Sequence, residues 1–237
     1  MGVTRFCSYP PQAAKIPKMG GYLDPNYEAV LRSKPDLVIV LQEHRTLISF
    51  LQKYSIQHLV VGNSSVEEIL QSFIRIALAC GVKERGDSLA WLLREQLRQD
   101  PPNDSAPTVL LCVGRDNPGG GTVSKVFAAG SGSFYDQLLN SSGAKNILTG
   151  NSQSYPSLTL ENILRLSPDI IIDISAAYSD ISSEKLLKDW HSLSSLPAVR
   201  QNQIFCLTGD YLTVPGPRLM KVVEQFRKIV KSCRSER

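Results

Sequence analysis

The sequence lacks the features that mark several large classes of protein. No apolar run in its 237 residues approaches the roughly 20 residues that a helix needs to cross a bilayer. Residues 1–7 have neither a basic start nor an apolar stretch, so they show no secretory signal. Aromatic residues make up only 7%, the net charge is only +4, and no Lys/Arg run is interleaved with aromatic rings. Neither a membrane-spanning nor a nucleic-acid-binding function is indicated.

Cysteine is scarce and is not arranged as a metal site. The five cysteines have no CxxC or CxH spacing, and three of them lie in apolar segments. We expect them to be small buried side chains kept as thiols, and their odd number argues against an exclusively disulfide-bonded protein. They are Cys7, Cys80, Cys112, Cys206 and Cys233.

The motifs of common enzymes are also missing. Residues 116–121 are rich in glycine but lack the Lys-Ser/Thr of a P-loop and the spacing of a dinucleotide-binding loop, so we expect a flexible turn there. Ser131 stands between two glycines, but no nucleophile elbow with triad partners is present, and we expect a cap or a hydrogen-bond donor. The sequence therefore predicts no catalytic residues and no enzyme.

An internal repeat is present. Residues 28–39 and 161–172 share Glu, Leu, Arg, Pro and Asp at matching positions without a gap, and the second copy lies 133 residues after the first. A tyrosine in a turn-rich segment precedes each copy, Tyr22 in the first and Tyr155 in the second. This degree of identity exceeds what a helix followed by a Pro-Asp turn requires, so the chain contains two related units.

Each copy predicts a short helix. We expect Asp24 to be the N-cap of the first helix and Ser157 that of the second, because short polar side chains accept hydrogen bonds from the first turn. Glu28 and Glu161 then lie in the first turn, where a carboxylate suits the positive end of the helix dipole.

Each helix is followed by a buried strand. Pro35 and Pro168 end the helices, because the residue before proline is disfavoured in the α region. The next segments, 37–41 and 170–174, are continuous rather than alternating apolar runs. Such runs are typical of strands covered on both faces, as in a parallel α/β sheet.

The remaining elements complete two lobes. Further strands are expected at 59–61, 109–113 and 204–207, and helices at 65–80, 83–98, 134–139, 186–190 and 218–230. The prolines at 101–107 break the chain. We therefore predict an N-terminal α/β lobe at 1–80, a bridging helix and linker at 81–103, and a C-terminal α/β lobe at 104–237.

The predicted fold class is α/β, with two Rossmann-like lobes bridged by one long α-helix and a ligand cleft between the lobes. The second lobe opens with a strand at 108–113, and the repeat offset places its counterpart before residue 1. We therefore expect that the first lobe lacks its opening strand and helix. If the reading frame upstream of residue 1 encodes a strand and a helix, the given sequence starts inside this lobe.

Several motifs in this order resemble the cobalamin, iron-siderophore and haem substrate-binding proteins of ABC importers. Besides the two repeats, the resemblance rests on residues 9–11, 15–22, 129–134, Trp190, 198–200 and 215–218. It covers essentially the whole chain and is specific for the family, though not for one ligand. The resemblance implies that the ligand is a cobalamin-like corrinoid, with an iron-siderophore or haem as the alternative, and that no cofactor is intrinsic to the protein.

The resemblance also implies which residues line the ligand site. The matching positions are Phe6, Tyr22, Phe127, Tyr155, Asp210 and Tyr211. Aromatic side chains suit a large flat macrocycle, because rings supply contact area at low entropy cost. Tyr22 and Tyr155 stand where some cobalamin binders have tryptophan, which leaves the ligand class open.

Residues 42–45 directly follow the first Pro-Asp strand, at the strand end where α/β proteins bind ligands. Gln42 and His44 are therefore further ligand-binding candidates. His44 could be an axial ligand to cobalt or iron, or a solvated loop residue making a polar contact. We expect His58 and His191 to be structural.

The resemblance further implies docking to a membrane permease. Glu28 and Glu161 match the paired carboxylates, one per lobe, that meet arginines on the two subunits of an ABC permease dimer; alternatively they only stabilise helix starts. No nucleic acid is expected as a partner, and membrane contact would come only through the permease or an N-terminal anchor outside the given sequence. The implied location is periplasmic or extracytoplasmic. The competing interpretation is a cytoplasmic α/β enzyme or corrinoid-handling protein.

Overall fold

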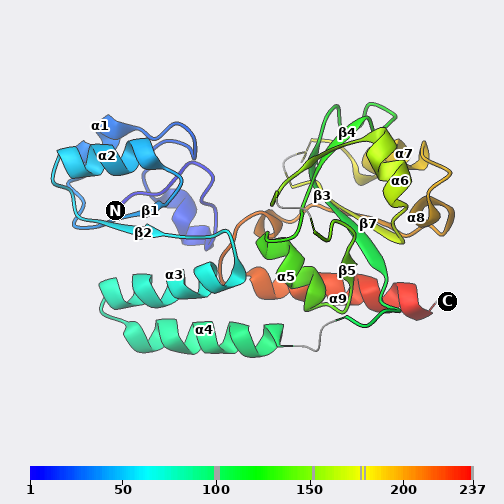
Figure 1. Ribbon diagram of the computed structural model, residues 1–237. Coiled ribbons are helices and arrows are strands. Elements are labelled where there is room, and N and C mark those ends of the chain that lie inside the picture. Colours follow the sequence, from blue (N-terminus) through cyan, green and yellow to red (C-terminus); the bar gives the residue numbers. More distant parts are fainter. Residues whose placement is uncertain (99–101, 151–152, 177, 179, 236–237) are drawn as a thin grey trace. The chain divides into compact units, whose positions relative to one another are not determined.

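The computed structural model describes residues 1–98, 102–150, 153–176, 178 and 180–235 (Figure 1). The chain forms two compact units, Met1–Gly62 and Asn63–Arg237, here called the N-terminal unit and the C-terminal unit. This division differs from the predicted boundary after residue 80. Residues 66–79 form a helix whose Ile69 and Leu70 are buried in the core of the C-terminal unit, so packing assigns that helix to the second unit.

The N-terminal unit contains a parallel pair of strands. Its elements are η1 (Pro11–Lys15), α1 (Tyr27–Ser33), β1 (Val38–Leu41), α2 (Arg45–Lys53) and β2 (His58–Val61). Val38 lies opposite His58 in this pair. The small core of the unit is centred on Val30, Val40 and Leu51, which come from α1, β1 and α2.

The C-terminal unit is built on a mixed six-stranded sheet. The strands are β3 (Thr108–Arg115), β4 (Lys125–Ala128), β5 (Lys145–Asn146), β6 (Ser157–Thr159), β7 (Ile170–Ile174) and β8 (Ile204–Leu207). The order is β6-β4-β3-β7-β8, with β5 also paired to β3. β5, β7 and β8 run parallel to their neighbours, whereas β4 and β6 are antiparallel.

Helices cover both faces of this sheet, which makes three layers (Figure 1). One face packs on α3 (Val66–Ala79), α4 (Lys83–Leu97), α5 (Phe134–Asn140) and α9 (Leu219–Ser235); the other packs on α6 (Leu160–Leu166), α7 (Ser183–His191) and α8 (Pro197–Arg200). Consecutive residues of β3 alternate between the layers: Val109 and Leu111 belong to the first core, Leu110 and Cys112 to the second. All four are fully buried, and β7 is buried throughout, which confirms the prediction of strands covered on both faces for this unit. The same prediction was wrong for residues 37–41, because Ile39 of β1 is 46% exposed.

The predicted bridging helix is α4, and it pairs with α3 (Figure 1). Arg227 of α9 holds the end of α4 to the unit. Its guanidinium donates hydrogen bonds to the carbonyl of Gln96 at 2.7 Å and to that of Ser141 at 3.2 Å. These carbonyls lie at helix ends, where the backbone leaves acceptors without helical partners.

The repeat is visible in the structure. α1 and α6 have the same length and begin 133 residues apart, and both end in a left-handed residue, Lys34 (φ 44°) and Ser167 (φ 53°). Each leads into a strand that pairs in parallel with the next strand of its own unit. The helices end before the prolines as predicted, but through a left-handed cap rather than through extended backbone.

The predicted N-caps were wrong in both copies. Asn26 caps α1, accepting from the Ala29 amide, while Asp24 pairs with Arg5 instead. Thr159 caps α6 in a capping box with Asn162, and Ser157 is part of β6. The long-range partners of Asp24 and Ser157 thus compete with the local cap that their side chains could form.

The five cysteines form no disulfide, as expected, but the expectation that they are all buried was wrong. Cys112 and Cys233 are buried, Cys7 and Cys206 are partly buried, and Cys80 is exposed. Burial raises the pKa of the Cys112 thiol, and it raises the pKa of the Cys206 thiol to about 12. Such thiols are protonated and inert at neutral pH. None of the helices in the described segments is long and apolar enough to cross a membrane.

Candidate functional site

In the N-terminal unit, two predicted site residues, Tyr22 and His44, meet at the end of β1 together with Glu43, which was not predicted as a site residue. Tyr22 lies in the turn before α1, where the Gly21 amide donates to the carbonyl of Asp24 at 3.1 Å. The Tyr22 hydroxyl donates to Glu43 Oε1 at 2.5 Å, and its ring meets the His44 ring edge-on at a centroid distance of 4.5 Å. The strand β1 and the turn before α1 therefore hold an aromatic pair and a carboxylate together.

Tyr22 keeps its proton in this setting. Partial burial, followed by the hydrogen bond and the charge of Glu43, raises the pKa of Tyr22 to about 12. Its side chain is still 43% exposed, so one part of the ring is accessible. The exposed part of the side chain is therefore neutral at physiological pH.

His44 is placed less favourably for metal binding. It is the N-cap residue of α2, but its side chain makes no capping hydrogen bond, and its Nε2 is shielded from solvent without a hydrogen-bond partner in the described residues. The neighbouring Tyr22 ring lies against it. Within the parts of the chain that the structure describes, no group of three or more His, Cys, Asp or Glu side chains could hold a metal ion.

Phe6 and Gln42 complete the predicted set in this unit. Phe6 is 72% exposed, and the Arg5 guanidinium lies 5.9 Å from its ring centroid. Arg5 is also paired with Asp24. Gln42 directly follows β1 and is exposed, and its backbone amide donates a hydrogen bond to the carbonyl of Val61 at 3.0 Å.

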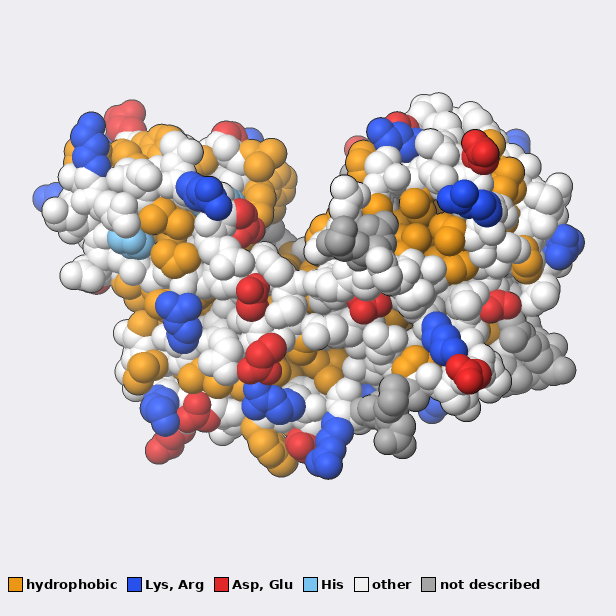
Figure 2. Space-filling view, viewed as in Figure 1, with side chains coloured by type: hydrophobic (Ala, Val, Ile, Leu, Met, Phe, Trp, Pro, Cys, Tyr) orange, Lys and Arg blue, Asp and Glu red, His pale blue; other side chains and the backbone are white. Residues whose placement is uncertain are grey.

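In the C-terminal unit, β4 presents Phe127. The ring is 39% exposed on a strand whose neighbours Val126 and Ala128 are buried, so it lies on the opposite side of the strand from them. The Lys125 ammonium lies 5.4 Å from the ring centroid. Figure 2 shows other hydrophobic side chains that reach the surface among polar ones.

Tyr155 is supported by a second tyrosine that the sequence analysis missed. Tyr155 is 46% exposed and meets the buried Tyr135 edge-on at 6.5 Å. The Tyr135 hydroxyl donates to the carbonyl of Leu212 at 2.6 Å, and burial raises its pKa above the usual range. Tyr135 therefore ties Tyr155 to η2 (Asp210–Leu212), the turn that carries Asp210 and Tyr211.

Asp210 is held by an arginine. Arg218 Nη1 lies 2.8 Å from Oδ1 and 2.9 Å from Oδ2 of Asp210, and the carboxylate is more than half exposed. Tyr211 is partly buried and packs against the core of the unit. The Asp210–Arg218 pair therefore presents carboxylate oxygens that can accept hydrogen bonds, while the charges of the two side chains offset each other. Arg218 lies in a motif that the sequence analysis had noted, but its partner could not be inferred from spacing.

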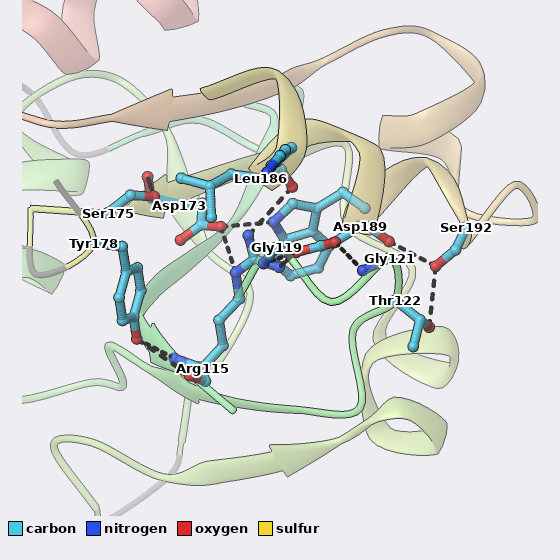
Figure 3. A network of polar contacts seen from close by, with 12 residues as sticks. Arg115, Gly119, Gly121, Thr122, Asp173, Ser175, Tyr178, Leu186, Asp189 and Ser192 are labelled. Carbon is cyan, nitrogen blue, oxygen red and sulfur yellow. Dashed lines mark hydrogen bonds and ion pairs between the residues drawn. The ribbon is translucent and has the colours of Figure 1, made fainter. Parts of the chain in front are cut away.

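A buried ion network fixes the ends of the central strands (Figure 3). Arg115 Nε lies 3.0 Å from Asp173 Oδ2, and Arg115 Nη1 lies 2.7 Å from Asp189 Oδ2; all three side chains are fully buried. Trp190 Nε1 donates to Asp173 Oδ2 at 2.8 Å. Burial raises the pKa of Asp173, and the Arg115 charge opposes that rise.

The same network anchors the glycine-rich loop. The amides of Gly119 and Gly121 each donate to the Asp189 carboxylate at 2.6 Å (Figure 3). The loop forms a turn, as predicted, and two of its amides are tied to the buried network. The two amides donate to the buried carboxylate of Asp189. Burying this charge is less unfavourable with these hydrogen bonds than it would be with Arg115 as the only partner.

The chain matches the family described as Periplasmic binding protein over residues 1–211. It belongs to the periplasmic binding protein family. Its α/β fold agrees with this assignment. Periplasmic binding proteins are transport components and not enzymes, so the prediction of a non-enzyme is confirmed.

Relatives of known name fall into the same group. An uncharacterised ABC transporter substrate-binding lipoprotein, YvrC of Bacillus subtilis, is 25% identical over 97% of this chain and 72% of its own length. The vitamin B12-binding protein of Salmonella paratyphi A is 24% identical over 95% and 80%. The solved structure of the periplasmic haem-binding protein BhuT with two haems is 22% identical, with a TM-score of 0.81 over 98% of this chain and 88% of that one.

The two docking candidates of this binding protein are exposed in their helices' first turns. Glu28 of α1 pairs with Arg32 one turn later. Glu161 of α6 is exposed and forms no ion pair within the described part of the chain. Both carboxylates are accessible, and both also lie where a helix dipole favours a negative charge.

Proposed function

We propose that this protein is the substrate-binding component of an ABC importer that takes up a flat metal chelate, with a cobalamin-like corrinoid as the first choice. The observation that carries the proposal is that Tyr22 and Tyr155 occupy equivalent positions of the repeat and are exposed to similar extents, 43% and 46%. A packing residue gains nothing from partial exposure, whereas a ligand wall requires it. We infer that both rings contact the ligand.

The polar groups beside these rings fit a ligand with hydrogen-bonding edges. Glu43 and the Asp210–Arg218 pair offer acceptor oxygens on the two units. A corrinoid carries amide side chains that donate to such oxygens. Haem and an iron-siderophore remain the alternatives, because both B12-binding and haem-binding proteins are similar to this chain.

Ligand binding is tested by titrating the purified protein with cyanocobalamin, haemin and a ferric siderophore, followed by visible absorption and tryptophan fluorescence. We expect at least one ligand to bind with a Kd below about 10 μM, equivalent to about −7 kcal/mol. Tyr22→Ala and Tyr155→Ala should each weaken binding about tenfold. Tyr54→Ala is the matched control, since Tyr54 is equally exposed and lies at the end of α2. Absence of binding to all three ligands would contradict the proposal.

The metal-coordinating role of His44 is tested with the same ligands. Coordination would use Nε2, which is shielded from solvent in this structure, so the side chain would have to expose that atom to the chelate. If His44 is an axial ligand, His44→Ala shifts the visible band of the bound chelate. Tyr22→Phe keeps the ring and removes the phenol, so it separates ring contact from coordination by the phenol oxygen.

We further propose that Glu28 and Glu161 dock the protein to the two subunits of a permease dimer. Both carboxylates are exposed at repeat-equivalent positions, which suits a partner that presents its basic surface twice. Charge reversal at both, Glu28→Arg with Glu161→Arg, should leave ligand affinity unchanged and abolish stimulation of the importer's ATPase. Glu84→Arg in the first turn of α4 is the matched control. Unchanged stimulation in the double variant would contradict docking.

We also propose that the protein works outside the cytoplasm, as its family does. Accessibility to protease added to intact cells that express the complete gene tests this placement. Protection of the protein until the cells are lysed would favour the competing interpretation, a cytoplasmic corrinoid-handling protein.

A further inference from the structure

Two aromatic side chains flank a glycine at the end of the central strand β3. Gly114 lies directly opposite Phe127 in the β3–β4 pair. A Cβ atom at Gly114 would lie 3.7 Å from the hydroxyl oxygen of Tyr178 and 3.8 Å from Cδ2 of Phe127. The missing side chain therefore leaves a shallow floor between the two rings.

Tyr178 is held firmly beside this floor (Figure 3). Its hydroxyl accepts a hydrogen bond from the Arg115 amide at 3.0 Å and donates one to the Arg115 carbonyl at 3.2 Å. Its own amide donates to the carbonyl of Ser175 at 2.9 Å, and its carbonyl accepts from Ile181 at 2.9 Å. Both ends of the residue are therefore fixed.

The anchor of Tyr178 is itself rigid. Arg115 carries the buried pairs with Asp173 and Asp189, which tie β3 to β7 and α7. A side chain that is held in advance loses little conformational entropy when a ligand binds. The place also suits a ligand, because Gly114 lies at the carboxyl end of β3 and Tyr178 follows the carboxyl end of the parallel strand β7.

We propose that Tyr178 and Phe127 form one aromatic wall across Gly114 and that this wall receives the edge of a flat, conjugated ring system. Tyr178 is thus a specificity-determining residue for the ligand; the inference rests on the proposed function and adds a contact that the resemblance did not indicate. Gly114 admits the edge of the ring because any larger side chain would occupy the space between Phe127 and Tyr178. The Tyr178 hydroxyl also borders the floor, but its hydrogen bonds go to the Arg115 backbone, so the wall offers ring surface and a hydroxyl that already has partners.

The wall is tested in the full chain with cyanocobalamin and haemin, by quenching of tryptophan fluorescence. Tyr178→Leu removes the ring, and Gly114→Ala fills the floor with a methyl group that meets its neighbours at ordinary contact distance. We expect each variant to weaken binding of the ligand that the wild-type protein prefers by about tenfold. Tyr178→Phe keeps the ring and loses only its anchor, so its loss should be smaller than that of Tyr178→Leu.

The controls separate binding from folding. Tyr54→Leu changes an equally sized exposed ring at the end of α2 and should bind as the wild type does. Thermal unfolding of each variant shows whether the fold is kept. Wild-type affinity in both Tyr178→Leu and Gly114→Ala would overturn the aromatic wall while leaving the proposed function intact. A wild-type protein that binds neither these chelates nor a ferric siderophore would overturn the proposed function, and the wall with it.

Discussion

At the scale of the residue, Arg115 stands out because it forms fully buried ion pairs with two carboxylates. Its guanidinium is fully buried with the carboxylates of Asp173 and Asp189, and two loop amides complete the shell of Asp189. One buried cation thus faces two buried carboxyl groups. Hydrogen bonds from Trp190 to Asp173 Oδ2, and from Gly119 and Gly121 to the two oxygens of Asp189, offset part of the cost of burying these charges.

Loss of this cation should be costly. We expect Arg115→Met to lower the free energy of unfolding by about 3–5 kcal/mol, because two carboxyl groups are left buried without a counter-charge. Arg94→Met is the matched control: Arg94 pairs with Glu67 at 2.9 Å, but both side chains are about half exposed. Its cost should be below about 1 kcal/mol, since solvent screens the pair. Urea denaturation measures both, and equal costs would contradict the account.

The same variant should show an altered pH dependence. Burial raises the pKa of Asp173 in the folded protein, so the folded state binds this proton more tightly than the unfolded chain, and stability from this group is lost as the pH rises above about 4. Arg115 opposes the rise. Without Arg115, the pKa of Asp173 in the folded protein rises further, so the folded state continues to lose stability at higher pH. The difference in free energy of unfolding between wild type and Arg115→Met should therefore widen from pH 4 to pH 7. A gap that is constant over this range would count against the interpretation.

At the scale of the element, the caps of the repeat helices show how local signals compete. Asn26 and Thr159 begin α1 and α6, whereas the sequence favoured Asp24 and Ser157. All four are good capping residues, and only the pairing of Asp24 with Arg5 and of β6 with β4 decides between them. The helix ends were easier to predict, because proline restricts the preceding residue wherever it occurs.

The left-handed cap after α6 offers a test at this scale. Ser167 has φ 53°, a conformation that costs a non-glycine residue about 1 kcal/mol. We expect Ser167→Gly to raise the free energy of unfolding by up to about 1 kcal/mol. Arg165→Gly, in the last turn of α6, should lower it by about 1 kcal/mol because glycine disfavours the helix. Chemical denaturation distinguishes the two, and destabilisation by Ser167→Gly would contradict the strain argument.

The strands divide into those that the sequence predicted and those that it did not. β3, β7 and β8 are continuous apolar runs and were predicted, whereas β4 and β6 are short and alternate between buried and exposed residues. An alternating strand of three or four residues carries too few positions for its period to be recognised, whereas the equally short β8 was predicted because its four residues are all apolar. Phe127 was still predicted as a site residue, but through the family resemblance and not through its strand.

At the scale of the whole molecule, the two units have separate cores. Among the residues that the structure describes, the clusters of buried side chains in the C-terminal unit contain none from Met1–Gly62, and the core of the N-terminal unit contains none from beyond it. Both tryptophans, the exposed Trp91 and the buried Trp190, lie in the C-terminal unit. Tryptophan fluorescence therefore reports on that unit.

We expect residues 63–237, expressed alone, to unfold in one cooperative transition whose fluorescence midpoint is close to that of the full chain. The reason is that the hydrophobic contacts around Trp190 are all internal to this unit. The fragment should bind the ligand more weakly than the full chain, because it lacks Tyr22 and its neighbours. A fragment without a cooperative transition would show that the C-terminal unit depends on residues 1–62 for folding.

The sequence by itself determined the repeat, the order of helices and buried strands, and the pair of equivalent tyrosines. These are properties of short stretches of chain, where apolar period, proline and turn residues act locally. Only the tertiary structure decided the partners of Arg115, one of them 74 residues away, and the contact that ties Tyr135 to Leu212 across 77 residues. It also decided that α3 belongs to the C-terminal unit. Such contacts depend on which side chains the packed layers bring together, and no spacing along the chain encodes that.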